Sequence, residues 1–127
     1  DDGRTSGGEA DARPAGPGKF VPNLQATDKM QQMTDLHPNF DCSEIADDLY
    51  KVAGSKGEIL KITPTQKYGD LNVIENGKTT ACDYHQVYSD GKYIFDPRYK
   101  NNPILKDDYI KMLSDLNGGK INIEVLK

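Results

Sequence analysis

Several common signatures are missing from this sequence of 127 residues, which contains no tryptophan, two cysteines and two histidines. No apolar run approaches the length of a membrane span or of a signal-peptide core. A glycine-rich phosphate loop, a His-Glu-x-x-His pair and an EF-hand loop are also missing, which removes the main sequence signs of nucleotide, zinc-protease and calcium sites. Any chemistry must therefore rest on a small set of nucleophilic and titratable side chains.

Basic residues are too few and too scattered to form a large polyanion-binding surface. The chain has 16 Lys and Arg against 20 Asp and Glu, for a net charge of −4, and the lysines alternate with acids. A nucleic-acid surface needs basic residues clustered on one face. The composition therefore argues against a nucleic-acid partner, and the lack of a long apolar run argues against a membrane.

The opening of the chain differs in composition from the rest. Its first 18 residues are rich in Gly, Asp, Ala and Pro, and hydrophobic residues make up only 35% of the whole sequence. Such segments behave as flexible linkers. We predict a flexible Gly/Pro-rich linker over residues 1–26 and one catalytic domain over residues 27–127. Because the first residue is Asp1, we interpret the chain as a piece of a longer protein.

The dipeptide Asp90-Gly91, flanked by two β-rich runs, predicts a β-hairpin with a two-residue type I′ turn. Such a turn fixes the register and places His85 opposite Asp96. Cβ atoms of directly opposed residues lie roughly 4.5–5.5 Å apart, close enough for an imidazole–carboxylate contact. A carboxylate on one ring nitrogen fixes the tautomer and leaves the other nitrogen free as a base. Two members of a catalytic triad are therefore predicted.

Cys42 is the predicted nucleophile, at the start of an amphipathic helix. Asp41 is a good N-cap and Glu44 completes a capping-box-like pattern, so Cys42 is the first helical residue. A thiol there lies at the positive end of the helix dipole, which favours the thiolate. The neighbouring acids oppose this effect, so a cationic His partner is needed. The apolar stripe of the helix consists of Ile45, Leu49 and Val52, with Ala46 and Ala53 beside it.

Hydrophobic periodicity predicts the remaining elements. The expected helices are Thr27–Thr34 and Ile104–Leu116, the latter with Leu105, Tyr109, Met112 and Leu116 inward, and the expected strands are Glu58–Thr63, Leu71–Glu75 before an Asn76-Gly77 turn, Thr79–Ser89, Lys92–Asp96 and Ile121–Val125 at an edge. Together they predict an α+β fold with one helical layer on an antiparallel sheet, in which the helix that carries the nucleophile packs on that sheet.

The second cysteine and the other histidine suggest alternatives to this site. Cys82 lies three residues before His85, so in a regular strand it faces the other way and is excluded from the site. A Cys42–Cys82 disulfide is possible in principle, but a single bridge is weak evidence for an oxidised framework, and we favour two free thiols. A Cys₂His₂ metal site would need His37 as well, which we interpret as an exposed loop residue. The spacing does not fit structural zinc, so we predict no metal and no cofactor.

The order of a Cys at a helix start, a His on a strand and an Asp on the next strand resembles the papain-like superfamily. The segment His85–Pro97 is most similar to the His strand, Asp-Gly turn and Asp-Pro strand of its transglutaminase-like branch. Within that group the chain resembles, from about Asn39 to Asn117, the papain-fold toxin domains of bacterial polymorphic toxins. It departs from the pattern because no aromatic residue follows Cys42 and no Gln before it supplies a second oxyanion donor.

The resemblance implies a papain-like core with Cys42, His85 and Asp96 as catalytic residues. It also implies acyl transfer at an amide, by a cysteine peptidase, a deamidase or a transglutaminase-like enzyme. Such a domain is a secreted effector, delivered into the target-cell cytoplasm as the C-terminal part of a larger protein. Its partners would be a target-cell protein substrate and a cognate immunity protein. Two alternatives remain: a ribonuclease toxin that uses His85 while Cys42 is structural, and a non-enzymatic binding module with a degenerate triad.

Overall fold

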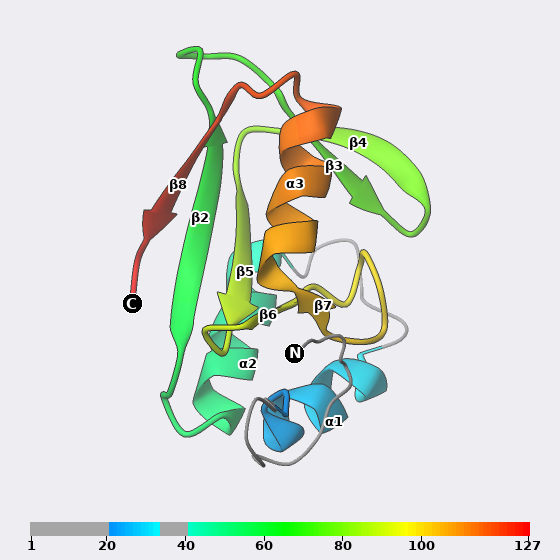
Figure 1. Cartoon of the computed structure of the whole chain (residues 1–127), viewed down its shortest axis with the longest axis vertical. Coiled ribbons are helices and arrows are strands. Elements are labelled where there is room, and N and C mark those ends of the chain that lie inside the picture. Colours follow the sequence, from blue (N-terminus) through cyan, green and yellow to red (C-terminus); the bar gives the residue numbers. More distant parts are fainter. Residues whose placement is uncertain (1–20, 34–40) are drawn as a thin grey trace.

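Five antiparallel strands form the main sheet of the computed structural model, which describes residues 21–33 and 41–127. Their order across the sheet is β7 (Ile104–Leu105), β6 (Tyr93–Phe95), β5 (His85–Ser89), β2 (Glu58–Pro64) and β8 (Ile121–Val125). A separate two-stranded sheet consists of β3 (Leu71–Glu75) and β4 (Lys78–Cys82). The helices are α1 (Leu24–Gln32), α2 (Cys42–Val52) and α3 (Lys106–Leu116) (Figure 1). The fold is α+β with an antiparallel sheet, as predicted.

Helices pack on both faces of the main sheet. Neighbouring residues on β5 point in opposite directions, so Val87 joins one core and Tyr88 the other. The first core joins α3 and the β3–β4 hairpin to the sheet and contains Leu60, Ile62, Leu71, Val73, Val87, Ile94, Tyr109 and Leu113. The second joins α1 and α2 to the opposite face and contains Ala26, Met30, Ile45, Leu49, Ala53, Tyr88 and Phe95. The prediction of a single helical layer is therefore wrong, because β5 contributes buried side chains on both of its faces.

The predicted long strand Thr79–Ser89 is in fact two strands in two sheets. β4 pairs with β3 through the Asn76-Gly77 turn, where both residues have positive φ (54° and 80°), as a type I′ turn requires. The chain then leaves the ladder after Cys82, and β5 begins at His85 as a partner of β2. β4 is largely exposed whereas β5 is largely buried, so the two halves of the run have different environments.

Two helices begin at other residues than predicted. α1 begins at Leu24 because the side-chain oxygen of Asn23 accepts the Ala26 N–H at 2.9 Å, so the helix includes the end of the predicted linker. α3 begins at Lys106 because the two residues before it pair with β6 as β7. Of its predicted inner face, Tyr109 is buried whereas Leu105 is 37% exposed. No helix within residues 21–33 and 41–127 is long and apolar enough to cross a membrane.

Candidate active site

The start of α2 holds Cys42 at its first position, as the capping pattern predicts. Asp41 has an extended backbone (φ −82°, ψ 169°), and its Oδ1 accepts the Glu44 N–H at 3.0 Å and the Ser43 hydroxyl at 2.6 Å. These two hydrogen bonds, the Ser43 one first, lower the pKa of Asp41. The Cys42 N–H is at a helical position where no carbonyl of the helix accepts it. Its half-buried thiol and this N–H therefore lie together at the positive end of α2.

His85 and Asp96 form the predicted contact. The Nε2 atom of His85 lies 2.9 Å from Oδ2 of Asp96, and the two side chains are only 3% and 7% exposed. The register that places them together differs from the predicted one. Tyr88 pairs with Phe95 and Ser89 with Ile94, a shift of two residues, so His85 is not directly opposite Asp96.

The shift arises from the Asp90 side chain. Its Oδ1 accepts the backbone N–H groups of Lys92, at 3.0 Å, and Tyr93, at 2.8 Å, which makes the loop longer than two residues. Of Asp90 and Gly91, only the glycine has a positive φ (105°), so the type I′ turn does not form. A shift of two keeps every side chain on its face. The His85 and Asp96 side chains therefore meet diagonally, at the point where β6 has just ended.

A residue that the sequence did not assign to the site completes the surroundings of Asp96. The Tyr109 hydroxyl, on α3, donates to Oδ2 of Asp96 at 2.6 Å, and Tyr109 is only 1% exposed. The Arg98 N–H also bonds this carboxylate. Periodicity predicted Tyr109 only as a packing residue. The sequence did contain one signal for a further role: a tyrosine on the inner face of a helix buries its hydroxyl, and a buried tyrosine O–H needs a hydrogen-bond partner.

Burial and charge oppose each other at the His85–Asp96 pair. Burial disfavours the imidazolium, but the charge and hydrogen bond of Asp96 outweigh it and, with Cys42, raise the pKa of His85 to about 10. Burial likewise disfavours the Asp96 carboxylate, but His85 and the Tyr109 hydroxyl outweigh it and lower the pKa of Asp96. Burial first and Asp96 second raise the pKa of Tyr109 well above its ordinary value. At neutral pH the site therefore holds an imidazolium, a carboxylate and a neutral phenol.

The Cys42 side chain reaches the same imidazole from α2. The interaction of the Cys42 side chain with His85 is one of those that favour the charged imidazole and raise the pKa of His85. Because Nε2 is bound to Asp96, Nδ1 is the ring nitrogen left for the thiol. The structure thus brings together all three residues that the sequence singled out: Cys42, His85 and Asp96.

Cys82 differs from Cys42 in the hydrogen-bond partner of its thiol, and strand parity does not explain the difference. The parity argument fails because β4 and β5 are different strands. The Cys82 thiol instead donates to the Leu71 carbonyl at 3.6 Å. Burial, followed by the charges of Cys42, Glu75 and Asp83, raises the pKa of Cys82 to about 11, so it stays a thiol at neutral pH. Both cysteines are free in the structure.

The metal alternative gains no support from the part of the chain that is described. His37, which a Cys₂His₂ site would require, lies outside the described residues. Within those residues, no three His, Cys, Asp or Glu side chains form a group suited to a metal ion.

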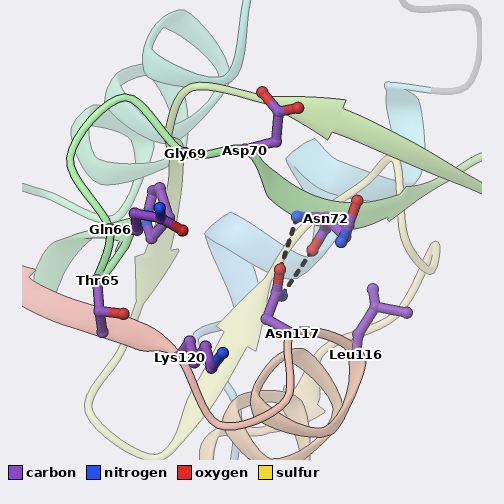
Figure 2. Close-up of a pocket in the computed structure, with 9 residues that line it drawn as sticks. Thr65, Gln66, Gly69, Asp70, Asn72, Leu116, Asn117 and Lys120 are labelled. Atoms are coloured by element: carbon purple, nitrogen blue, oxygen red, sulfur yellow. Dashed lines mark hydrogen bonds between the residues drawn. The ribbon is translucent and has the colours of Figure 1, made fainter.

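A separate pocket of about 180 Å³ lies between the end of β2, the start of β3 and the end of α3 (Figure 2). Its lining includes Asn117, which accepts the Asn72 N–H and donates to the Asn72 carbonyl, at 2.8 and 2.9 Å. The same amide donates to the Leu113 carbonyl of α3 at 2.8 Å. Asn117 is therefore engaged in joining α3 to β3. The lining contains no Cys or His, so we assign it no chemistry; it consists of Pro64, Thr65, Gln66, Gly69, Asp70, Asn72, Leu116, Asn117 and Lys120.

No protein-family model matches the chain, and comparisons with curated proteins and with solved structures give no match.

Proposed function

We propose that this domain is a papain-like cysteine hydrolase or acyltransferase that acts on an amide. The observation that carries the proposal is the placement of one buried imidazole between the Asp96 carboxylate and the Cys42 thiol. Each group has the neighbour that its role requires: a helix start for the thiol, a carboxylate for the imidazole, and additional donors for the carboxylate. We also propose that the α+β fold of this domain is a papain-like core.

The raised pKa of His85 determines how the reaction would begin. At neutral pH the imidazole already carries a proton, and a cysteine attacks only as its thiolate. The proposed reactive form is therefore a Cys42 thiolate, whose proton has passed to solvent, beside a His85 imidazolium. The thiolate attacks the carbonyl carbon, and the Cys42 N–H donates to the resulting oxyanion. The C–N bond then breaks as His85 passes its proton to the leaving nitrogen, which yields a thioester and ammonia or an amine. Water, deprotonated by His85, releases the acid; an attacking amine would give a new amide instead.

The cellular role that we propose rests on the resemblance of His85–Pro97 to papain-fold toxin domains. We propose a secreted bacterial effector that is delivered into the target-cell cytoplasm as the C-terminal part of a larger protein. Its substrate would be a target-cell protein, and a cognate immunity protein would protect the producing cell. The net charge of −4 and the scattered basic residues support a protein substrate over a nucleic acid.

Two observations weigh against the ribonuclease alternative. A nuclease base must be unprotonated to accept a proton from a ribose hydroxyl, whereas the Asp96 carboxylate keeps the proton on His85 at neutral pH. A nearby cation would also be needed to hold phosphate. Arg98 is the basic residue that follows Asp96 and Pro97 in the chain. Its guanidinium lies 3.9 Å from the Glu75 carboxylate, and its charge also lowers the pKa of Asp41, so it already interacts with two carboxylates.

Expression in a bacterial cytoplasm without a partner protein tests the proposal. The wild-type domain should arrest growth, Cys42→Ala and His85→Ala should abolish the arrest, and the matched control Cys82→Ala should not. Intact-mass comparison of cytosolic proteins should then reveal a cleaved backbone, a Gln or Asn converted to its acid, or an amine adduct. Arrest by a folded Cys42→Ala variant, with RNA cut and protein masses constant, would favour the ribonuclease. Normal growth with the wild-type domain would overturn the toxin assignment.

A further inference from the structure

The Asp96 carboxylate is bonded by more donors than a triad requires. Oδ2 alone accepts from His85, at 2.9 Å, and from Tyr109, at 2.6 Å. The Arg98 N–H is a third donor to the same carboxylate. The Asp96 backbone is also fixed, because its carbonyl accepts the N–H groups of Tyr99 and Lys100, both at 3.0 Å. Asp96 is thus immobilised at both its main chain and its side chain.

Tyr109 is the only one of these side-chain and main-chain donors that comes from α3. Its hydroxyl projects from a helix on the first core to a carboxylate that follows the short strand β6. Asp96 lies just beyond the last residue of that strand, so sheet pairing does not orient it. A hydrogen bond from a packed helix supplies the orientation that the ladder lacks.

We propose that Tyr109 is a positioning residue, whose hydroxyl holds the Asp96 carboxylate so that Oδ2 faces His85 and, through it, aligns the imidazole with Cys42. This inference rests on the proposed Cys–His–Asp site. Tyr109 is only 1% exposed, so water does not reach its hydroxyl. The hydrogen bond to Asp96 therefore replaces the hydrogen bonds to water that both groups lose on folding. The hydroxyl stays protonated throughout the neutral range and donates at every pH at which the site would work.

The chain offers a matched control in Tyr99. Its ring meets the Tyr109 ring edge-on, with the centroids 5.6 Å apart, and it lies in the segment that follows Asp96. Tyr99→Phe therefore removes a phenol hydroxyl beside the site without removing a donor to Asp96. Tyr109→Phe keeps the buried ring and removes only the oxygen.

A double-mutant cycle distinguishes positioning through Asp96 from a general structural role. The readout is the second-order rate of Cys42 alkylation by iodoacetamide at pH 7, measured by peptide mass spectrometry on folded protein, which needs no knowledge of the substrate. Tyr109→Phe should lower this rate about tenfold, as the loss of one hydrogen bond to a charged group does, and Tyr99→Phe should leave it unchanged. In an Asp96→Asn background, Tyr109→Phe should change the rate less than twofold.

Each other outcome has a definite meaning. An equal loss in both backgrounds would mean that Tyr109 acts on the fold and not through Asp96, which overturns the inference. A rate that falls with His85→Ala but not with Tyr109→Phe also overturns it, while the proposed function stands. An alkylation rate unchanged by His85→Ala would overturn the Cys42–His85 pair itself, and the role of Tyr109 with it.

Discussion

The two thiols of this chain differ in the groups that surround them. Cys42 lies at a helix start and interacts with the His85 imidazole, whereas Cys82 bonds a main-chain carbonyl and has its pKa raised to about 11. Because the thiolate is the nucleophile, we predict that iodoacetamide modifies Cys42 much faster than Cys82 in the native protein near neutral pH. The measurement is time-resolved peptide mass spectrometry, with unfolded protein as the control in which the rates converge. Equal labelling in the folded state would contradict the assignment.

Asp96 is predicted to orient His85 without accepting its proton. In Asp96→Asn the amide keeps the shape of the side chain but presents an N–H₂ to the ring, which favours the wrong tautomer. Turnover of an activated ester such as 4-nitrophenyl acetate should fall by about 10²–10⁴-fold, while the circular dichroism spectrum stays the same. Asp115→Asn, which changes only an exposed pair with Lys111, is the matched control. Unchanged turnover would mean that the His85–Asp96 pair is structural.

At the scale of elements, the close approach of the chain just before β2 to the end of β5 depends on a glycine. Gly57 has φ +99°, and a Cβ there would lie 2.8 Å from the Tyr88 hydroxyl and nearer still to the Ser89 carbonyl oxygen. Gly54 also has a positive φ (75°) but has open space around it. We predict that Gly54→Ala costs about 1–2 kcal/mol of unfolding free energy, from backbone strain. Gly57→Ala should cost about 1–3 kcal/mol more, from steric overlap. Urea denaturation compares them, and equal losses would contradict the close approach.

Local signals predicted the elements well, and long-range contacts decided the rest. The Asp41 cap fixed the first residue of α2, and Asn76-Gly77 fixed the β3–β4 turn, because each signal acts within four residues. The register of β5 and β6 was wrong because the Asp90 side chain competes for turn N–H groups. Its Oδ2 also accepts the Asn23 N–H from the segment before α1, at 2.9 Å, a contact that no local pattern reveals.

The contact between His85 and Asp96 forms despite the wrong register, because it depends on which face of the sheet each side chain occupies and not on which residues pair directly. A shift of two residues keeps His85 and Asp96 on one face, whereas a shift of one would have separated them. The role of Tyr109 was not predictable in this way, since it depends on how α3 crosses the sheet. Likewise, the division of Thr79–Ser89 between two sheets depends on which strands are available to pair, which is a property of the whole chain.

At the scale of the whole molecule, the site joins elements from both layers around the sheet. Cys42 comes from α2, whose apolar side chains belong to one core, and Tyr109 from α3, which packs in the other. His85 is the first residue of β5, and Asp96 directly follows the last residue of β6. The buried ion pair is therefore coupled to the stability of the whole fold, and the pH dependence of unfolding should report it.

The sign of that dependence follows from the two pKa values. His85 rises from 6.5 in the unfolded chain to about 10 in the fold, so its contribution to stability is complete below pH 6.5 and is lost as the pH rises toward 10. Asp96 is lowered below 3.8, so its contribution is complete above pH 3.8 and is lost on acidification through its folded pKa. The pair therefore stabilises the fold most between about pH 4 and 6.5.

We predict that the unfolding free energy of the wild type falls between pH 6.5 and 9 relative to that of His85→Gln, which cannot titrate. The difference should shrink with a slope approaching about 1.4 kcal/mol per pH unit, the effect of one proton that the native state binds and the unfolded state releases. Urea denaturation of both proteins at half-unit steps of pH measures it. Ending the series at pH 9 keeps the phenol of Tyr109 and the thiol of Cys82 protonated in the folded state. Parallel stability curves for the two proteins would mean that the folded site binds no net extra proton between pH 6.5 and 9, which would contradict the prediction.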